Sequence, residues 1–206
     1  IIRPTAGELK GLGETPRRAG AAQCRRIGYR PGELRLAAHT SGGTLLHHLA
    51  QISGPVAPGS ISSLAERLGL DLAQPVHSLS KGNKQKLGLV QAFMHQPELL
   101  ILDEPTSGLD PLVQREFLTM VREARDAGQT VLLSSHVLSE IQRTADEVAV
   151  LAQGQILARG DVESLRLSSV ARLRASIVRE PAELVRTALG QVKSLEALDV
   201  EPAVSD

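Results

Sequence analysis

The sequence of 206 residues is poor in cysteine, aromatic residues, net charge and long apolar runs. Its single cysteine, Cys24, excludes an internal disulfide, and no neighbouring residue gives it the spacing of a metal site. With one tyrosine, two phenylalanines and no tryptophan, a core has to be built mainly from leucine, valine, isoleucine and alanine. The 23 basic and 23 acidic residues balance, so bulk charge does not favour a nucleic acid as partner. No apolar run approaches the roughly 18 residues of a membrane-spanning helix.

The second half of the chain alternates between strand and helix patterns. The apolar run Leu99–Leu102 is typical of a strand buried on both faces, and the periodic segment that follows it is closed by Gly128. A strand, a helix and a second strand in this order predict a βαβ unit, and hence a parallel sheet. The predicted elements are a strand at 99–102, a helix at 112–127, a strand at 131–134, a helix at 137–145 and a hairpin of strands at 148–151 and 155–158.

The first half predicts a short strand followed by a helical part. Ile27–Tyr29 has the composition of a strand, and residues 40–97 contain three helical patterns separated by loops. These helices are predicted at 44–53, at 60–70 with Ser60 or Ser62 as cap, and at 80–95. Near residue 165 the pattern changes, so we expect a domain over residues 1–165 and an α+β appendage over residues 166–206.

Two consecutive carboxylates, Asp103 and Glu104, follow the apolar strand directly. Ligands of parallel sheets bind at the carboxyl ends of the strands, so this is where a site is expected. Because alternate residues of a strand point in opposite directions, one acid can support Mg²⁺ while the other faces an attacking water. Four preceding apolar residues argue against a merely exposed acidic pair.

The segment that begins at Ser80 reads SKGNKQK and precedes a helical pattern. Ser80 on its own is explained equally well as a helix cap. The free amides of a helix N-terminus also attract phosphate, with Ser80 supplying a hydroxyl and Gly82 allowing the backbone to approach closely. The residues of this segment alone leave both interpretations open.

Taken together, Leu79–Gln85 and Leu99–Asp110 resemble the signature motif and the Walker B segment of ABC-type ATPases, with LSGGQ changed to LSKGN. The resemblance implies an α/β fold, a partial P-loop NTPase with a parallel sheet and a helical subdomain, and it implies ATP and Mg²⁺ as cofactors. It gives Asp103 the role of magnesium ligand and Glu104 and His136 catalytic roles. Nucleotide-binding residues would be Ser80, Lys81, Gly82, Asn83 and Gln85, and the D-loop would be Ser107, Gly108, Leu109 and Asp110.

Two departures from this family pattern stand out. No G-x-x-x-x-G-K-[ST] string occurs, although this Walker A loop normally cradles the phosphates. The opening residues 1–8 resemble the segment that follows the Walker A helix, so we expect the domain to lack its amino-terminal Walker A segment. Gly32–Glu33 stands where the family usually has the glutamine of the Q-loop, and Glu33 is a weaker candidate for a metal ligand.

By this resemblance, the chain would be the ATP-hydrolysing subunit of an exporter of the multidrug type. It would pair head to tail with a second ATPase subunit, act on a separate membrane permease and lie in the cytoplasm at the inner face of the membrane. The absent Walker A loop makes activity of this chain doubtful. Alternatives are a translation-associated ABC protein without a transport role and an inactive, truncated gene product.

Overall fold

The computed structural model of the chain describes residues 5–7, 10–15, 20–32 and 39–162. The expected boundary near residue 165, the appendage over 166–206 and Glu33 lie outside these ranges. Within them, no helix is long and apolar enough to cross a membrane. The elements are α1 (Ala21–Cys24), β1 (Ile27–Arg30), α2 (Gly42–Ser53), α3 (Ser60–Arg67), the 3₁₀ helix η1 (Val76–Ser78), α4 (Lys81–Phe93), β2 (Leu99–Asp103), α5 (Pro111–Asp126), β3 (Thr130–Ser134), α6 (Leu138–Thr144), β4 (Glu147–Ala152) and β5 (Gln155–Asp161).

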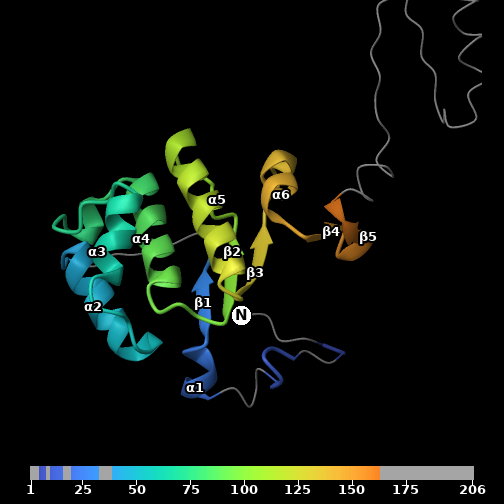
Figure 1. Ribbon diagram of the computed structural model, residues 1–206, viewed down its shortest axis with the longest axis horizontal. Helices are drawn as coiled ribbons and strands as arrows, with labels where there is room; N and C mark the ends of the chain where they lie inside the picture. The colour runs from blue at the N-terminus through green and yellow to red at the C-terminus, as the bar shows by residue number, and fades with distance from the viewer. Residues whose placement is uncertain (1–4, 8–9, 16–19, 33–38, 163–206) are drawn as a thin grey trace, which may run out of the picture. The chain divides into compact units, whose positions relative to one another are not determined.

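Strands β1, β2 and β3 form a parallel sheet with β2 in the centre. The alternation of strand and helix therefore gives the α/β architecture that the sequence predicts. Strand β1 packs tightly on α4, since a Cβ on Gly28 would lie 2.3 Å from the carbonyl oxygen of Ala92. Figure 1 shows α2, α3 and α4 grouped on the β1 side of this sheet, and α5 lies against β3.

One helix begins two residues earlier than predicted, and another begins at the predicted residue but with a different cap. Helix α2 begins at Gly42 instead of residue 44, because the Ser41 side chain accepts a hydrogen bond from the Thr44 amide and so caps the helix two residues earlier. The predicted cap at Ser60 or Ser62 is wrong. Gly59, with φ of 79°, is the N-cap of α3, and the Ser60 hydroxyl instead donates to the Met94 carbonyl.

The predicted hairpin is confirmed as β4 and β5, which pair antiparallel. Its turn is Gln153–Gly154, and both residues have positive φ, 51° and 76°. Two consecutive left-handed residues are the geometry of a type I′ turn, which matches the twist of the strands that it joins.

A continuous apolar core holds the helices against the sheet. Leu100 and Leu102 of β2 are almost fully buried, whereas Leu99 and Ile101 on the other face are only half-buried, so the predicted burial of this strand is confirmed for one face. The core consists mainly of aliphatic side chains, and Phe93 of α4 meets Phe117 of α5 edge to face at 6.4 Å between ring centres. These two rings join the helical part to the βαβ unit and supply most of the aromatic surface that the sequence contains.

Candidate active site

The carboxyl ends of β2 and β3 bring Asp103 beside Ser134, its partner in the parallel register. The Ser134 hydroxyl donates to Asp103 Oδ1 at 2.6 Å and accepts a hydrogen bond from the Glu104 amide at 3.0 Å. One serine thus fixes both the carboxylate of Asp103 and the backbone of the next residue. The sequence gives no sign of this role, because it depends on strand pairing across 31 positions.

Glu104 leaves the strand in a left-handed conformation, with φ of 46°. This region is costly for a residue with a Cβ, so the surrounding contacts must hold the backbone there. The turn aims the Glu104 carboxylate at His136, and Oε2 lies 2.7 Å from Nδ1 of the ring. Glu104 is half-buried and His136 is exposed, so one edge of the pair faces solvent.

Asp103 receives a second hydrogen bond, from the Gly32 amide to Oδ2 at 3.2 Å. A Cβ on Gly32 would lie 2.9 Å from that oxygen, so the contact depends on glycine. With two donors bound, the exposed carboxylate keeps lone pairs free for a metal-bound water. Among the described residues, no three His, Cys, Asp or Glu side chains cluster as a metal cage. Mg²⁺ is usually held by one or two carboxylates plus phosphate and water, so a site of this kind fits Asp103.

Ser80 caps α4 through a hydrogen bond from the Asn83 amide, at 3.2 Å, and its side chain is exposed. The next turn touches the loop after β2: a Cβ on Gly82 would lie 3.0 Å from the Gly108 carbonyl oxygen. The predicted signature and D-loop segments therefore lie in close contact through Gly82 and Gly108.

Gln85 differs from the four residues before it, because its side chain is buried. Its amide oxygen accepts a short hydrogen bond from Arg30, and its amide nitrogen lies 3.5 Å from the Gly32 carbonyl oxygen. Gln85 therefore faces the interior of its own domain and does not reach the surface where nucleotide contact is expected. Sequence reasoning assigned no role to Arg30, which is fully buried at the end of β1. Burial lowers the pKa of Arg30 to about 10, against the opposing influence of Asp103 and Glu104, so the guanidinium is charged at neutral pH.

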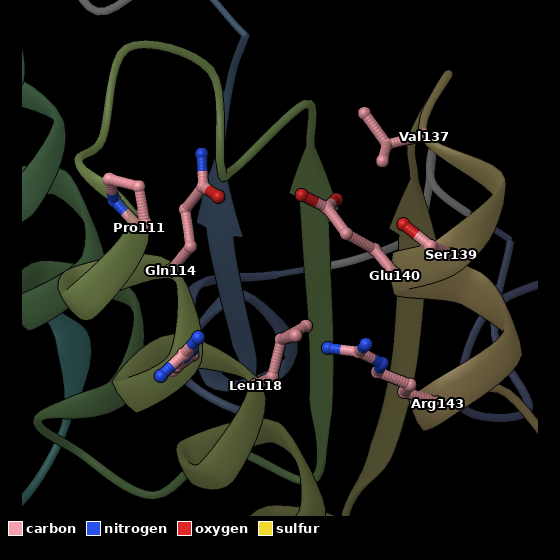
Figure 2. A pocket seen from close by; sticks show the side chains of 8 residues that line it. Pro111, Gln114, Leu118, Val137, Ser139, Glu140 and Arg143 are labelled. Carbon is pink, nitrogen blue, oxygen red and sulfur yellow. The ribbon is translucent and has the colours of Figure 1, made fainter.

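A second buried polar side chain, Glu140 of α6, was also missed. Figure 2 shows it extending across a hollow between α5 and α6 toward the end of β2. Its Oε2 accepts hydrogen bonds from the hydroxyls of Thr106 and Ser135, both at 3.0 Å. Gln114 of α5 reaches the same loop and donates to the Leu109 carbonyl at 3.0 Å. The loop after β2 is thus held from both neighbouring helices.

The loop ends at Asp110, which caps α5. Its carboxylate accepts hydrogen bonds from the amides of Leu112 and Val113 at 3.0 and 3.1 Å, and Pro111 occupies the first helical position. The hydrogen bond from Val113 lowers the pKa of Asp110. This capping role is local, and it fixes the direction in which the loop enters the helix.

Comparison with known proteins places this arrangement in a family. Residues 43–141 match the family model described as "AAA domain, putative AbiEii toxin, Type IV TA system". A solved structure titled "Structure of ATP binding subunit of ABC transporter" superposes with a TM-score of 0.74 and 28% identity, covering 81% of this chain and 72% of that one. The fold is that of a P-loop NTPase.

Curated relatives narrow this class. The uncharacterized ABC transporter ATP-binding protein all4389 of Nostoc sp. is 33% identical over 172 residues, which are 80% of this chain and 51% of that protein. The bacitracin transport ATP-binding protein BcrA of Bacillus licheniformis is 35% identical over 160 residues, 76% of this chain and 52% of that protein. The chain spans about half the length of these relatives. The chain is similar to ABC transporter ATP-binding proteins, and these matches together with the fold support an ABC ATPase domain.

Proposed function

We propose that this chain forms part of the ATP-binding subunit of an ABC exporter, which powers a separate membrane permease from the cytoplasmic side. The observation that carries the proposal is the junction of Asp103, Glu104 and His136 at the carboxyl ends of β2 and β3. One relative is named a bacitracin transport ATP-binding protein, which supports a transport role. The surface at Ser80 would serve a second ATPase subunit arranged head to tail.

In this proposal each residue at the junction has a distinct task. Bound Mg²⁺ would neutralise charge on the phosphates, and Asp103 would support it through a water. Glu104, left half-exposed by its turn, orients the attacking water and accepts its proton. His136 holds the Glu104 carboxylate at 2.7 Å and would contact the terminal phosphate of a bound nucleotide. These groups are preorganised by Ser134 and Gly32, which limits reorganisation during the reaction.

The other side of the proposed site uses the N-terminus of α4. Ser80, Lys81, Gly82 and Asn83 present a hydroxyl, an ammonium group and backbone amides at a positive helix end. In a head-to-tail dimer they would contact the nucleotide of the opposite subunit. Gln85 supports this turn from inside the domain. The D-loop, Ser107–Asp110, would lie at the same subunit interface.

The 206-residue chain tested by itself should neither bind ATP at micromolar affinity nor hydrolyse it. The described site contains carboxylates and one helix N-terminus, and the sequence contains no glycine-rich loop with a lysine to cradle the phosphates. Isothermal calorimetry with Mg²⁺ and ATP measures this directly. Micromolar binding would show that the phosphates are held by groups that this proposal does not include.

A chimaera that supplies a Walker A strand and loop ahead of residue 1 should hydrolyse ATP in the presence of Mg²⁺. In that background, Glu104→Gln should keep nucleotide binding and slow turnover by about 10²-fold or more, the scale of a lost general base. Unchanged turnover would remove Glu104 from the catalytic role.

Dimerisation tests the signature segment separately. In the chimaera carrying Glu104→Gln, Ser80→Arg should abolish the ATP-dependent dimer and leave ATP binding to the monomer intact. Ser63→Arg, on the exposed face of α3, is the matched control for added size and charge. If Ser80→Arg dimerises as well as the control, Ser80 is a helix cap only.

A further inference from the structure

The buried guanidinium of Arg30 is the feature of this domain that the proposed function does not use. Arg30 ends β1 and is fully buried, which is rare for arginine unless the charge has specific partners. It donates from Nη1 to the Asp103 carbonyl oxygen at 2.5 Å and from Nη2 to the Gln85 side chain. Its Nε has no hydrogen-bond partner among the described residues.

The two acceptors belong to different parts of the domain. Asp103 ends the central strand and carries the candidate magnesium site, whereas Gln85 lies in the second turn of α4, directly behind the signature segment. The Gln85 amide returns to the Gly32 carbonyl oxygen, and the Gly32 amide donates to the Asp103 carboxylate. Arg30, Gln85, Gly32 and Asp103 thus form a closed ring of hydrogen bonds.

We propose that Arg30 is a positioning residue that locks the signature turn of α4 to Asp103 in the chain without nucleotide, so that the groups which one subunit would give to two different ATP sites are held in a fixed relation before nucleotide binds. The inference rests on the proposed function for the meaning of the two ends, but the link itself exists without nucleotide. Planarity is essential: the fork of the guanidinium reaches two acceptors at once, which a lysine ammonium on a flexible stem does not reproduce.

A spectroscopic test uses the chain without any substitution in its first step. In ¹H–¹⁵N spectra of the unliganded chain, the Arg30 Nη groups should give separate, slowly exchanging signals, because both are held by buried acceptors. Gln85→Met should collapse these signals and shift the Gly32 amide, which belongs to the same ring. Averaged Nη signals in the unsubstituted chain, or a Gly32 amide unmoved by Gln85→Met, would overturn the proposal.

A double-mutant cycle measures whether the two side chains act together. Arg30→Met should reduce the unfolding equilibrium constant by tenfold or more, since it leaves a buried amide oxygen and a backbone carbonyl without donors. Adding Gln85→Met should cost much less than it does in the parent chain. Arg30→Lys keeps the charge but should behave like Arg30→Met. Additive losses, or full rescue by lysine, would show that no forked link exists.

Arg26 provides the matched control. It stands just before β1 and forms an ion pair with Glu98 at the opposite end of the same two strands, at 2.6 Å. Both partners are solvent-exposed. Arg26→Met should therefore leave the Arg30 signals and the Gly32 amide unchanged. If Arg26→Met disturbs them equally, the signals report general loosening of β1 and the proposed lock is refuted. The ATPase assignment is tested by the chimaera and does not depend on these spectra.

Discussion

The left-handed conformation of Glu104 predicts that glycine at this position gives a more stable protein than alanine, the reverse of the usual order. In extended backbone, a glycine variant is less stable than the alanine variant by about 0.5–1 kcal/mol, because glycine gives the unfolded chain more conformational freedom. At φ of 46° a Cβ costs roughly 1–2 kcal/mol, and glycine does not incur that cost. Glu104→Gly should therefore be more stable than Glu104→Ala by roughly 0.5–1 kcal/mol. Both variants lose the contact with His136, so that loss cancels in the comparison.

Urea unfolding followed by circular dichroism measures this difference in free energy, and in thermal unfolding the midpoint temperatures should differ by about 2 °C in a domain of this size. Gln153, with φ of 51° in the β4–β5 turn, is the positive control and should show the same order. Thr130, exposed in extended strand β3, is the negative control, and there alanine should be the more stable. If alanine is also the more stable at residue 104, the turn does not store strain and the account of how Glu104 is aimed is wrong.

Three further predictions concern other parts of the domain. Burial lowers the pKa of His95, so folding favours the neutral imidazole. The contribution of His95 to the free energy of unfolding is therefore fully present above about pH 6.5 and is lost as the pH falls toward the lowered pKa of the folded state. Urea unfolding at a series of pH values should show this loss in the parent chain and not in His95→Gln. Gly82→Ala places a Cβ 3.0 Å from the Gly108 carbonyl oxygen, so the ATP-dependent dimer of the chimaera should weaken at least tenfold by sedimentation, while Gly20→Ala, with open space around it and a negative φ, should not alter the dimer. Glu140→Leu leaves the buried Thr106 hydroxyl and the partly buried Ser135 hydroxyl without their acceptor and should cost about 1–3 kcal/mol in urea unfolding, whereas Glu140→Gln should recover most of it.

The parallel sheet was predictable because the run Leu99–Leu102 carries apolar side chains on both faces of the central strand, although only Leu100 and Leu102 are fully buried. The hairpin turn was predictable for a similar local reason, since Gln153–Gly154 supplies the two left-handed residues. The starts and caps of the helices were less predictable. Ser41 caps α2 from a position that residue pattern alone did not mark, and α3 is capped by a glycine whose neighbouring serine bonds to a distant carbonyl.

The residues of the candidate site also divide into those that the sequence predicts and those that it does not. Asp103, Glu104 and His136 follow strands, so the topology of a parallel sheet brings them to one edge. Arg30 and Glu140 could not be found by such reasoning, because a partner that holds each buried side chain lies far along the chain: Asp103 is 73 positions from Arg30, and Thr106 is 34 positions from Glu140. In the sequence, both read as ordinary surface residues. The backbone turn at Glu104 was also unpredicted, since nothing in the sequence distinguishes it from one more strand residue before Pro105.

The meeting of Gly82 and Gly108 differs from the other contacts of the site in what it can transmit. A hydrogen bond resists both approach and separation, whereas two backbones pressed together without side chains resist only approach. Motion of the loop toward α4 is therefore passed on at once, and motion away from α4 is not. This contact can therefore transmit a displacement of the loop toward α4. A displacement in the opposite direction has to be driven by other contacts of the domain.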